Sequence, residues 1–161
     1  METNLGARDE KRLIENATVN GFLKLYNLQK GDDFSVTTHG DSPDFVCSNS
    51  AGRRFNVEVT TAYDADGDMQ VLLGRASSRK VPRSHRLRDF VLENLLVTIR
   101  KKSMKRYGLN TALVIRQTSG VDWDWEMETE AIRSGLSGST LPYDAGVWIV
   151  NRTMTKIWRL L

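Results

Sequence analysis

RRFNVEVTTA, residues 53–62, decides the fold because it is the clearest strand in the chain. Phe55, Val57 and Val59 alternate with polar residues, and a period of two is typical of a β-strand. One face of this strand is therefore expected to be apolar, and the other to present Glu58 and Thr60. The pattern predicts a sheet that carries a carboxylate on its polar face.

A second strand is expected immediately upstream, at residues 44–48 (DFVCS). The NSAG sequence at 49–52 favours a turn between the two strands, so they should form a β-hairpin. Pairing through this turn brings Asp44 and Glu58 near each other on the same polar face. Two such carboxylates can hold Mg²⁺, a hard cation that takes oxygen ligands and keeps several waters, or Mn²⁺ in its place. Asp41, on the turn before Asp44, is a competing ligand.

The segments around this hairpin predict a layered domain. Apolar residues at helical spacing indicate a first helix over 9–28, stopped at Gly31, and a short strand at 33–38 follows it. The longest helix is expected over 85–107, stopped by Gly108, and its buried stripe comprises Leu87, Val91, Leu95, Ile99 and Met104. The remaining expected elements are strands at 69–73, 111–117, 146–151 and 155–160 and an acidic helix at 122–134. This order implies an α/β (α+β) fold with a central mixed β-sheet flanked by helices.

Composition limits the classes of protein that this chain can represent. The 161 residues are 40% hydrophobic and 27% charged, which is typical of one globular domain, taken as 1–161. A single cysteine and two histidines exclude an intramolecular disulfide framework, a multi-cysteine zinc site and a histidine-rich metal cage. No apolar run of about 18 residues and no signal-peptide pattern is present. A cytoplasmic protein without a membrane partner is therefore expected.

The charges are segregated along the chain although the net charge is only +3. Residues 75–106 hold many lysines and arginines and only two acids, whereas residues 32–68 are predominantly acidic. A basic segment beside an acidic one suits an anionic polymer held next to a cation-binding pocket. The alternative is a solvated helix with a basic loop before it.

Pro43-Asp44, thirteen intervening residues and then Glu58-Val59-Thr60 resemble the motif of the PD-(D/E)XK (restriction-endonuclease-like) nuclease superfamily. The resemblance covers the chain from the first helix to strand 111–117, and the order of elements matches as well. It implies a restriction-endonuclease-like core and an Mg²⁺-dependent nuclease that hydrolyses phosphodiester bonds of DNA. It also implies that Asp44 and Glu58 bind the metal, and that Glu15, on the first helix, lies near the site.

Thr60 departs from the superfamily pattern because it occupies the position of the motif lysine. That lysine positions the attacking water and stabilises the charge that develops on the phosphate. Some members of the superfamily supply the lysine from the following helix, and Lys102 is favoured here because it lies three residues after the buried Ile99. Lys105 is the second candidate. The alternative for each is an ordinary lysine on the surface of an amphipathic helix.

Basic residues before and within the long helix are the expected contacts to the nucleic-acid backbone. These residues are Arg75, Arg79, Lys80, Arg83, Arg86, Arg88 and Lys105. Cleavage is expected to be structure-selective or nonspecific, because a chain of this length leaves little room for a sequence-reading element. The resemblance also implies a homodimer.

Two other functions stay open. The first is a catalytically inactive nuclease-like fold, favoured by Thr60, that acts as a nucleic-acid-binding or protein-interaction or inhibitor module of a phage or mobile element. Its docking surface would be the acidic, tryptophan-bearing segment 122–130. The second is a protein-interaction domain unrelated to nucleases.

Overall fold

The computed structural model describes residues 6–62, 87–118 and 123–161. These residues form a six-stranded mixed sheet whose strands lie side by side in chain order. The central pairs β3–β4 and β4–β5 are parallel, and the outer pairs are antiparallel. The strands are β1 (Ser35–His39), β2 (Phe45–Ser48), β3 (Arg54–Ala62), β4 (Thr111–Gln117), β5 (Val147–Val150) and β6 (Ile157–Arg159). The expected α+β architecture with a central mixed sheet is confirmed.

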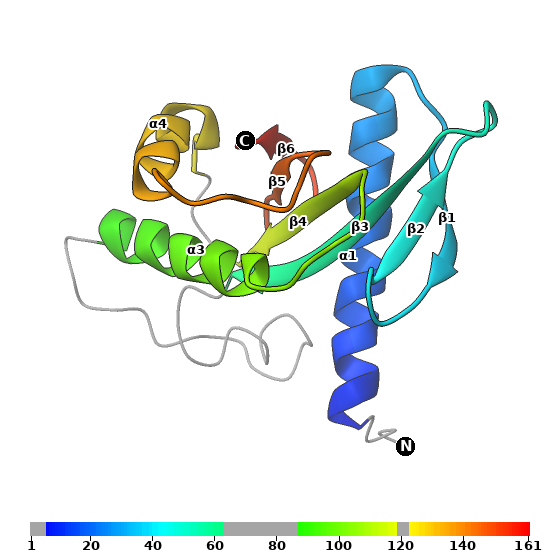
Figure 1. The fold of residues 1–161 in the computed structure, drawn as a ribbon, viewed down its shortest axis with the longest axis horizontal. Coiled ribbons are helices and arrows are strands. Elements are labelled where there is room, and N and C mark those ends of the chain that lie inside the picture. The colour runs from blue at the N-terminus through cyan, green and yellow to red at the C-terminus, as the bar shows by residue number, and fades with distance from the viewer. Residues whose placement is uncertain (1–5, 63–86, 119–122) are drawn as a thin grey trace.

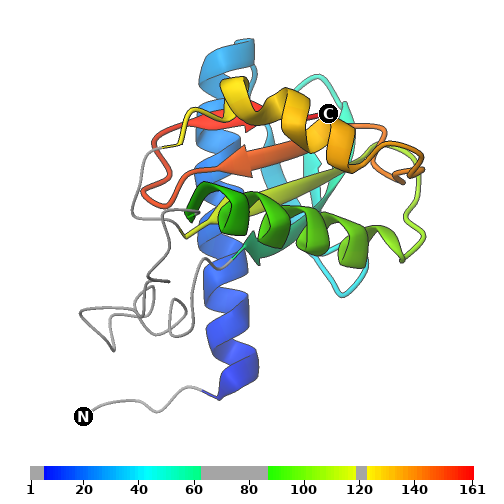
Figure 2. The same ribbon diagram turned by 90° about the vertical axis from the view of Figure 1, so that its left-hand side faces the viewer.

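Helices cover both faces of this sheet (Figures 1 and 2). The helix α1 (Ala7–Lys30) crosses one face, and α3 (Leu87–Ser103) and α4 (Trp125–Gly135) lie on the other. Each face has its own apolar core: Phe22, Val57 and Val114 belong to the α1 side, and Leu95 and Ile115 belong to the α3 side. The two cores fix the sheet between the helical layers.

The first helix ends at Lys30, two residues later than predicted, and Gly31 stops it as the sequence indicates. Gly31 adopts the left-handed conformation, with φ 64°, and its N–H donates to the carbonyl of Asn27. The side-chain amide of Asn27 both accepts from the N–H and donates to the carbonyl of Phe34, each at 2.9 Å. These bonds fix the path of the chain from α1 into β1. The strand β1 begins at Ser35, two residues after the start of the expected strand at 33–38.

The β2–β3 hairpin is the element that brings the acidic residues together. Phe45 pairs with Val57 and Ser48 with Arg54, and the predicted turn at 49–52 joins the strands. Phe45 and Val57 are buried on the α1 side, so the residues that alternate with them face α3. Continuing this register by one residue places Asp44, just before β2, opposite Glu58.

The structure corrects the predicted end of the long helix. The long helix ends at Ser103 rather than at 107, and the Met104 side chain, expected on the buried stripe, is 85% exposed. The structure also adds that α3 covers the polar face of β3, so that Glu58 is 2% exposed. The strand expected at 69–73 lies outside the described residues.

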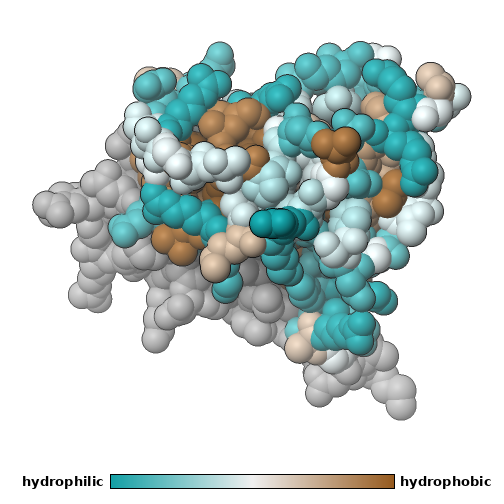
Figure 3. All heavy atoms as spheres, in the orientation of Figure 1, coloured by the Kyte–Doolittle hydropathy of each residue, from teal (hydrophilic) through white to brown (hydrophobic). Residues whose placement is uncertain are grey.

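The surface of the described residues is largely hydrophilic in the view of Figure 3, where hydrophobic residues show only in separate patches. Across the residues placed by the structure, no helix is long and apolar enough to cross a membrane.

Candidate functional site

Asp44 and Glu58 form a buried carboxylate pair at the end of the β2–β3 hairpin. Asp44 is 9% exposed and Glu58 2%, and the two hold directly opposed positions on neighbouring strands. The backbone N–H of Val59 donates to Oδ2 of Asp44 at 2.9 Å, which fixes the orientation of this carboxylate. The predicted convergence of the two acids is therefore present in the structure.

The environment of Glu58 favours its protonated form. Burial raises the pKa of Glu58 to about 7, and the charge of Asp44 and a hydrogen bond with it act in the same direction. The positive charges of Lys102 and Lys105 oppose this rise in pKa. Glu58 therefore changes charge near neutral pH, whereas an ordinary glutamate is fully ionised there.

Lys102 supplies the cation of the site. Its Nζ lies 3.8 Å from Oε2 of Glu58, and its side chain is 22% exposed. The last turn of α3 carries it, one residue before the helix ends at Ser103. Thr60 is half-buried and lies two residues after Glu58 on the same face of β3. The structure thus brings Lys102 to the carboxylates, while Lys105 is exposed and acts on Glu58 only through its charge.

Glu15 lies close enough to feel the charge of Asp44. It is buried on α1, and its Oε1 lies 3.5 Å from Nζ of Lys11. Burial raises the pKa of Glu15, the negative charge of Asp44 raises it further, and Lys11 and Lys102 lower it. Carboxylates from α1, from the start of β2 and from β3 therefore share one electrostatic environment.

Tyr107 is a neighbour of the site to which the sequence analysis gave no role. Its hydroxyl donates to the carbonyl of Lys102 at 3.4 Å, and its ring centroid lies 5.4 Å from that of Tyr143. Burial and the negative charges of Glu58 and Asp44 raise the pKa of Tyr107. The sequence did contain one indication of this role. Tyr107 is an aromatic residue directly before Gly108, the predicted end of the helix, and such a residue can pack against the end of α3.

The donor set fits a hard divalent cation. Asp44 and Glu58 offer carboxylate oxygens, the ligands that Mg²⁺ and Mn²⁺ prefer, and a cation between them would relieve the repulsion that raises the pKa of Glu58. Within residues 6–62, 87–118 and 123–161, no group of three or more histidine, cysteine, aspartate or glutamate side chains is arranged to hold a metal ion. Waters would complete the coordination, as they commonly do for Mg²⁺.

Most of the predicted nucleic-acid contacts lie outside the described residues. Arg75, Arg79, Lys80, Arg83 and Arg86 lie outside the described residues, and so does the side chain of Arg88 in the first turn of α3. The competing ligand Asp41 is exposed on the turn before Asp44.

Comparison of this chain with protein-family profiles, with curated proteins and with solved structures finds no match.

Proposed function

We propose that the protein is an Mg²⁺-dependent nuclease that hydrolyses phosphodiester bonds of DNA in a structure-selective or nonspecific manner. The observation that carries this proposal is the buried Asp44–Glu58 pair with Lys102 against it. The two acids, from a hairpin, can hold a metal ion that activates water, and the base, from a separate helix, can stabilise charge on the phosphate. Mn²⁺ is the expected substitute for Mg²⁺.

Each residue has a distinct task in this proposal. The bound cation would lower the pKa of a water and neutralise charge on the phosphate. Asp44, oriented by the N–H of Val59, and Glu58, once deprotonated, would hold the cation. Lys102 stabilises the negative charge that develops on the phosphate oxygens as water adds to phosphorus and the bond to the leaving oxygen breaks.

Thr60 has the smaller role of a hydrogen-bonding neighbour. A threonine hydroxyl can orient a water but brings no positive charge, so the charge must come from Lys102. Glu15 keeps the acidic surroundings of Asp44 and is proposed as an auxiliary residue of the same site.

A cleavage assay on duplex and single-stranded DNA with added Mg²⁺ tests the proposal. We expect Asp44→Asn and Glu58→Gln each to remove metal-dependent cleavage, and Asp41→Asn to retain it, because Asp41 is exposed on the same turn. Cleavage that persists in both variants would come from another site or a contaminant and would overturn the proposal.

A second candidate is favoured by Thr60, which stands where the superfamily that the motif resembles has lysine. In this alternative the fold binds nucleic acid without cutting it, or serves as an interaction or inhibitor module of a phage or mobile element. Salt-sensitive DNA binding without cleavage, unchanged in Asp44→Asn and Glu58→Gln, would support it. Both candidates place the protein in the cytoplasm, and a homodimer stays a prediction from the resemblance.

A further inference from the structure

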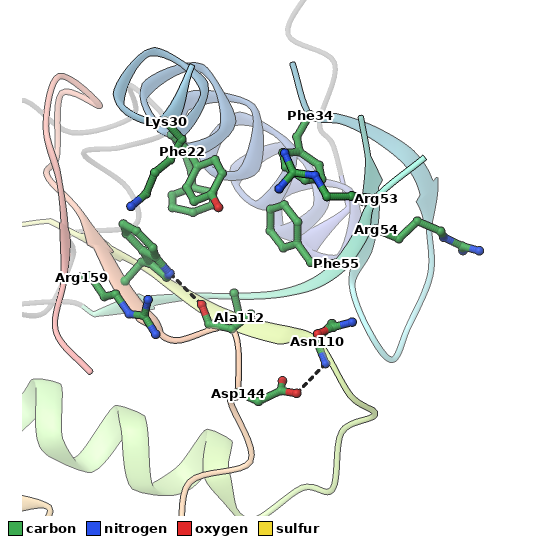
Figure 4. Close-up of a pocket in the computed structure, with 13 residues that line it drawn as sticks. Phe22, Lys30, Phe34, Arg53, Arg54, Phe55, Asn110, Ala112, Asp144 and Arg159 are labelled. Carbon is green, nitrogen blue, oxygen red and sulfur yellow. Dashed lines mark hydrogen bonds between the residues drawn. The ribbon is translucent and has the colours of Figure 1, made fainter. Parts of the chain in front are cut away.

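A hollow of about 540 Å³ lies on the opposite face of the sheet from Glu58 (Figure 4). Its walls come from α1, from the start of β3 and β4 and from β5. Ala112 and Trp148 line it and belong to the apolar core on the α1 side. The hollow is therefore separate from the carboxylate site, and its volume is in the usual range for a small-molecule pocket.

The floor of the hollow is an aromatic cluster centred on Tyr26, in which Tyr26 and Phe55 are half-buried and the other rings are buried. The ring centroid of Tyr26 lies 5.5 Å from those of Phe22 and Trp148, 5.7 Å from that of Phe55 and 6.0 Å from that of Phe34. All these separations are in the range of favourable aromatic contacts. A floor held by so many mutual contacts is preformed, as small-molecule sites usually are.

The rim of the hollow is cationic. Lys30 lies one helical turn after Tyr26 on the same face of α1, and in Figure 4 its side chain extends towards the side of the hollow where Arg159 lies. Lys30 is exposed, and among the described residues it has no ion pair or hydrogen bond through its side chain. It is therefore available to an anion.

Two arginines are held at the rim in defined positions. The guanidinium of Arg53 lies over the ring of Phe34, 5.6 Å from its centroid, and is ion-paired with Asp32. That of Arg159 lies over Trp148 at 5.8 Å, and its Nε donates to the Leu161 oxygen at 2.9 Å. Each guanidinium has five N–H donors, so both keep donors for a ligand. Arg54 also lines the hollow, but Figure 4 shows its side chain pointing away.

Asp144 is the acidic residue of the lining, and its charge is already engaged. Its carboxylate accepts from the N–H groups of Asn110 and Thr111, each at 2.8 Å. These bonds lower the pKa of Asp144, so it is ionised and serves to hold the start of β4. The lining therefore keeps an excess of positive charge beside an aromatic floor.

We propose that this hollow binds a nucleotide, with the base against Tyr26 and Phe55 and the phosphate at Lys30 and Arg159, which lie on the same side of the hollow in Figure 4. Flat heterocycles stack on aromatic side chains without regard to base identity, and guanidinium groups bind phosphate through paired N–H donors. The proposal does not depend on the nuclease function, because the two sites occupy opposite faces of the sheet.

The test is a titration of the full chain with AMP, adenosine and inorganic phosphate in separate experiments without divalent metal. The indole N–H chemical shift of Trp148 and the backbone amide shifts around it report binding at the floor. We expect AMP to bind more tightly than adenosine or phosphate alone, with shifts around Tyr26 and Trp148. AMP that binds no better than either fragment, or shifts that cluster around Glu58 and Lys102, would overturn the proposal.

Matched lysine variants on α1 sharpen the test. Lys30→Gln should raise the Kd for AMP by about tenfold, because a charge-assisted contact to phosphate is lost. Lys24→Gln, an exposed lysine of the same helix outside the lining, should leave it unchanged. Equal affinities in these two variants would contradict the proposal. Lys102→Gln should leave AMP binding unchanged, because Lys102 belongs to the carboxylate site and does not line the hollow. The affinity for AMP therefore tests this proposal separately from the nuclease proposal.

Discussion

Nζ of Lys102 lies 3.8 Å from Oε2 of Glu58, although the lysine lies in the last turn of α3 and the glutamate in the middle of β3. Asp44, on the neighbouring strand, repels the same carboxylate and helps to raise its pKa to about 7. Glu58 is thus placed between a fixed acid and a fixed base. Small changes in charge around it should have measurable effects.

Glu58→Gln should gain stability relative to the wild type as the pH rises from about 4.5 to 7. The folded chain holds the pKa of Glu58 near 7, above its ordinary value of 4.5, so the unfolded chain loses the proton first and the free energy of unfolding falls across this window. Glutamine has no proton to lose. Chemical denaturation of both proteins at pH 4, 5.5, 7 and 8 measures the difference, which should level off above pH 7.

Asp144→Asn is a control for that series, because its stability relative to the wild type should change with pH in the opposite direction. Backbone N–H groups lower the pKa of Asp144, so its charge stabilises the fold above the ordinary pKa, and this contribution is lost as the pH falls through the folded pKa. The variant should therefore be less stable than the wild type at neutral pH and approach it in acid. A pH-independent gap between Glu58→Gln and the wild type would contradict the environment assigned to Glu58.

Stabilisation by Mg²⁺ should depend on pH with a midpoint set by Glu58. A cation bound to this carboxylate must displace its proton below pH 7, so the apparent affinity should fall by about tenfold per pH unit there. Thermal melts with and without Mg²⁺ or Mn²⁺ at pH 6 and pH 8 test this. The rise in Tm should be larger at pH 8 and absent in Asp44→Asn; equal rises at both pH values would show binding elsewhere.

Lys102→Gln should lower kcat for DNA cleavage by about 10²–10³-fold, the usual cost of removing one stabiliser of transition-state charge. Lys105→Gln should have a much smaller effect, because Lys105 is exposed and reaches Glu58 only through its charge. Single-turnover cleavage at saturating Mg²⁺ separates this step from metal binding. Equal losses in the two variants would indicate general electrostatic attraction to DNA instead.

Thr60→Lys in the Lys102→Gln background should recover part of the lost cleavage. Thr60 lies on the same face of β3 as Glu58 and two residues further along, so a lysine there projects its ammonium group towards the same region. Recovery requires only the return of a positive charge near the phosphate. The double variant should be compared with Thr61→Lys/Lys102→Gln, in which the new lysine faces the other side of the sheet; recovery in both would contradict a positional role.

Gly146→Ala should destabilise the fold more than Gly52→Ala. Both glycines have positive φ, 98° and 78°, and alanine in such a conformation costs about 1–2 kcal/mol. A Cβ on Gly146 would also lie 2.9 Å from Nε of Arg159 and 3.0 Å from the Leu161 oxygen, whereas nothing lies within 4 Å of one on Gly52. Urea unfolding of both variants gives the difference; equal losses would mean that the segment around Arg159 and Leu161 moves aside freely.

Local patterns were sufficient to predict the elements of the fold. Alternating residues located β3, the NSAG turn located the hairpin, and a continuous apolar run located β4 at Thr111–Gln117 without error. Asp44 and Glu58 could be paired because a hairpin fixes its register through its turn. Lys102 could be favoured because its spacing from Ile99 places it at the edge of the buried stripe of α3.

Tertiary contacts determined what the sequence patterns did not reveal. Alternation identified a polar face on β3 but not the helix that covers it, so the burial of Glu58 and its raised pKa were not foreseen. The exposure of Met104 depends on where the chain leaves the helix. The hollow around Tyr26 draws Lys30, Arg53 and Arg159 from three distant segments, and no spacing in the sequence relates them.

The mixed pairing of the sheet has a consequence for the order of folding. The antiparallel β2–β3 hairpin closes over a short stretch of chain, whereas the parallel β3–β4 pair requires a long crossover that includes α3. Short-range contacts form faster because closing a longer loop costs more entropy. In a folding chain, Asp44 and Glu58 should therefore come together before Lys102 packs against them. At that stage two negative charges lie close together with no positive charge beside them.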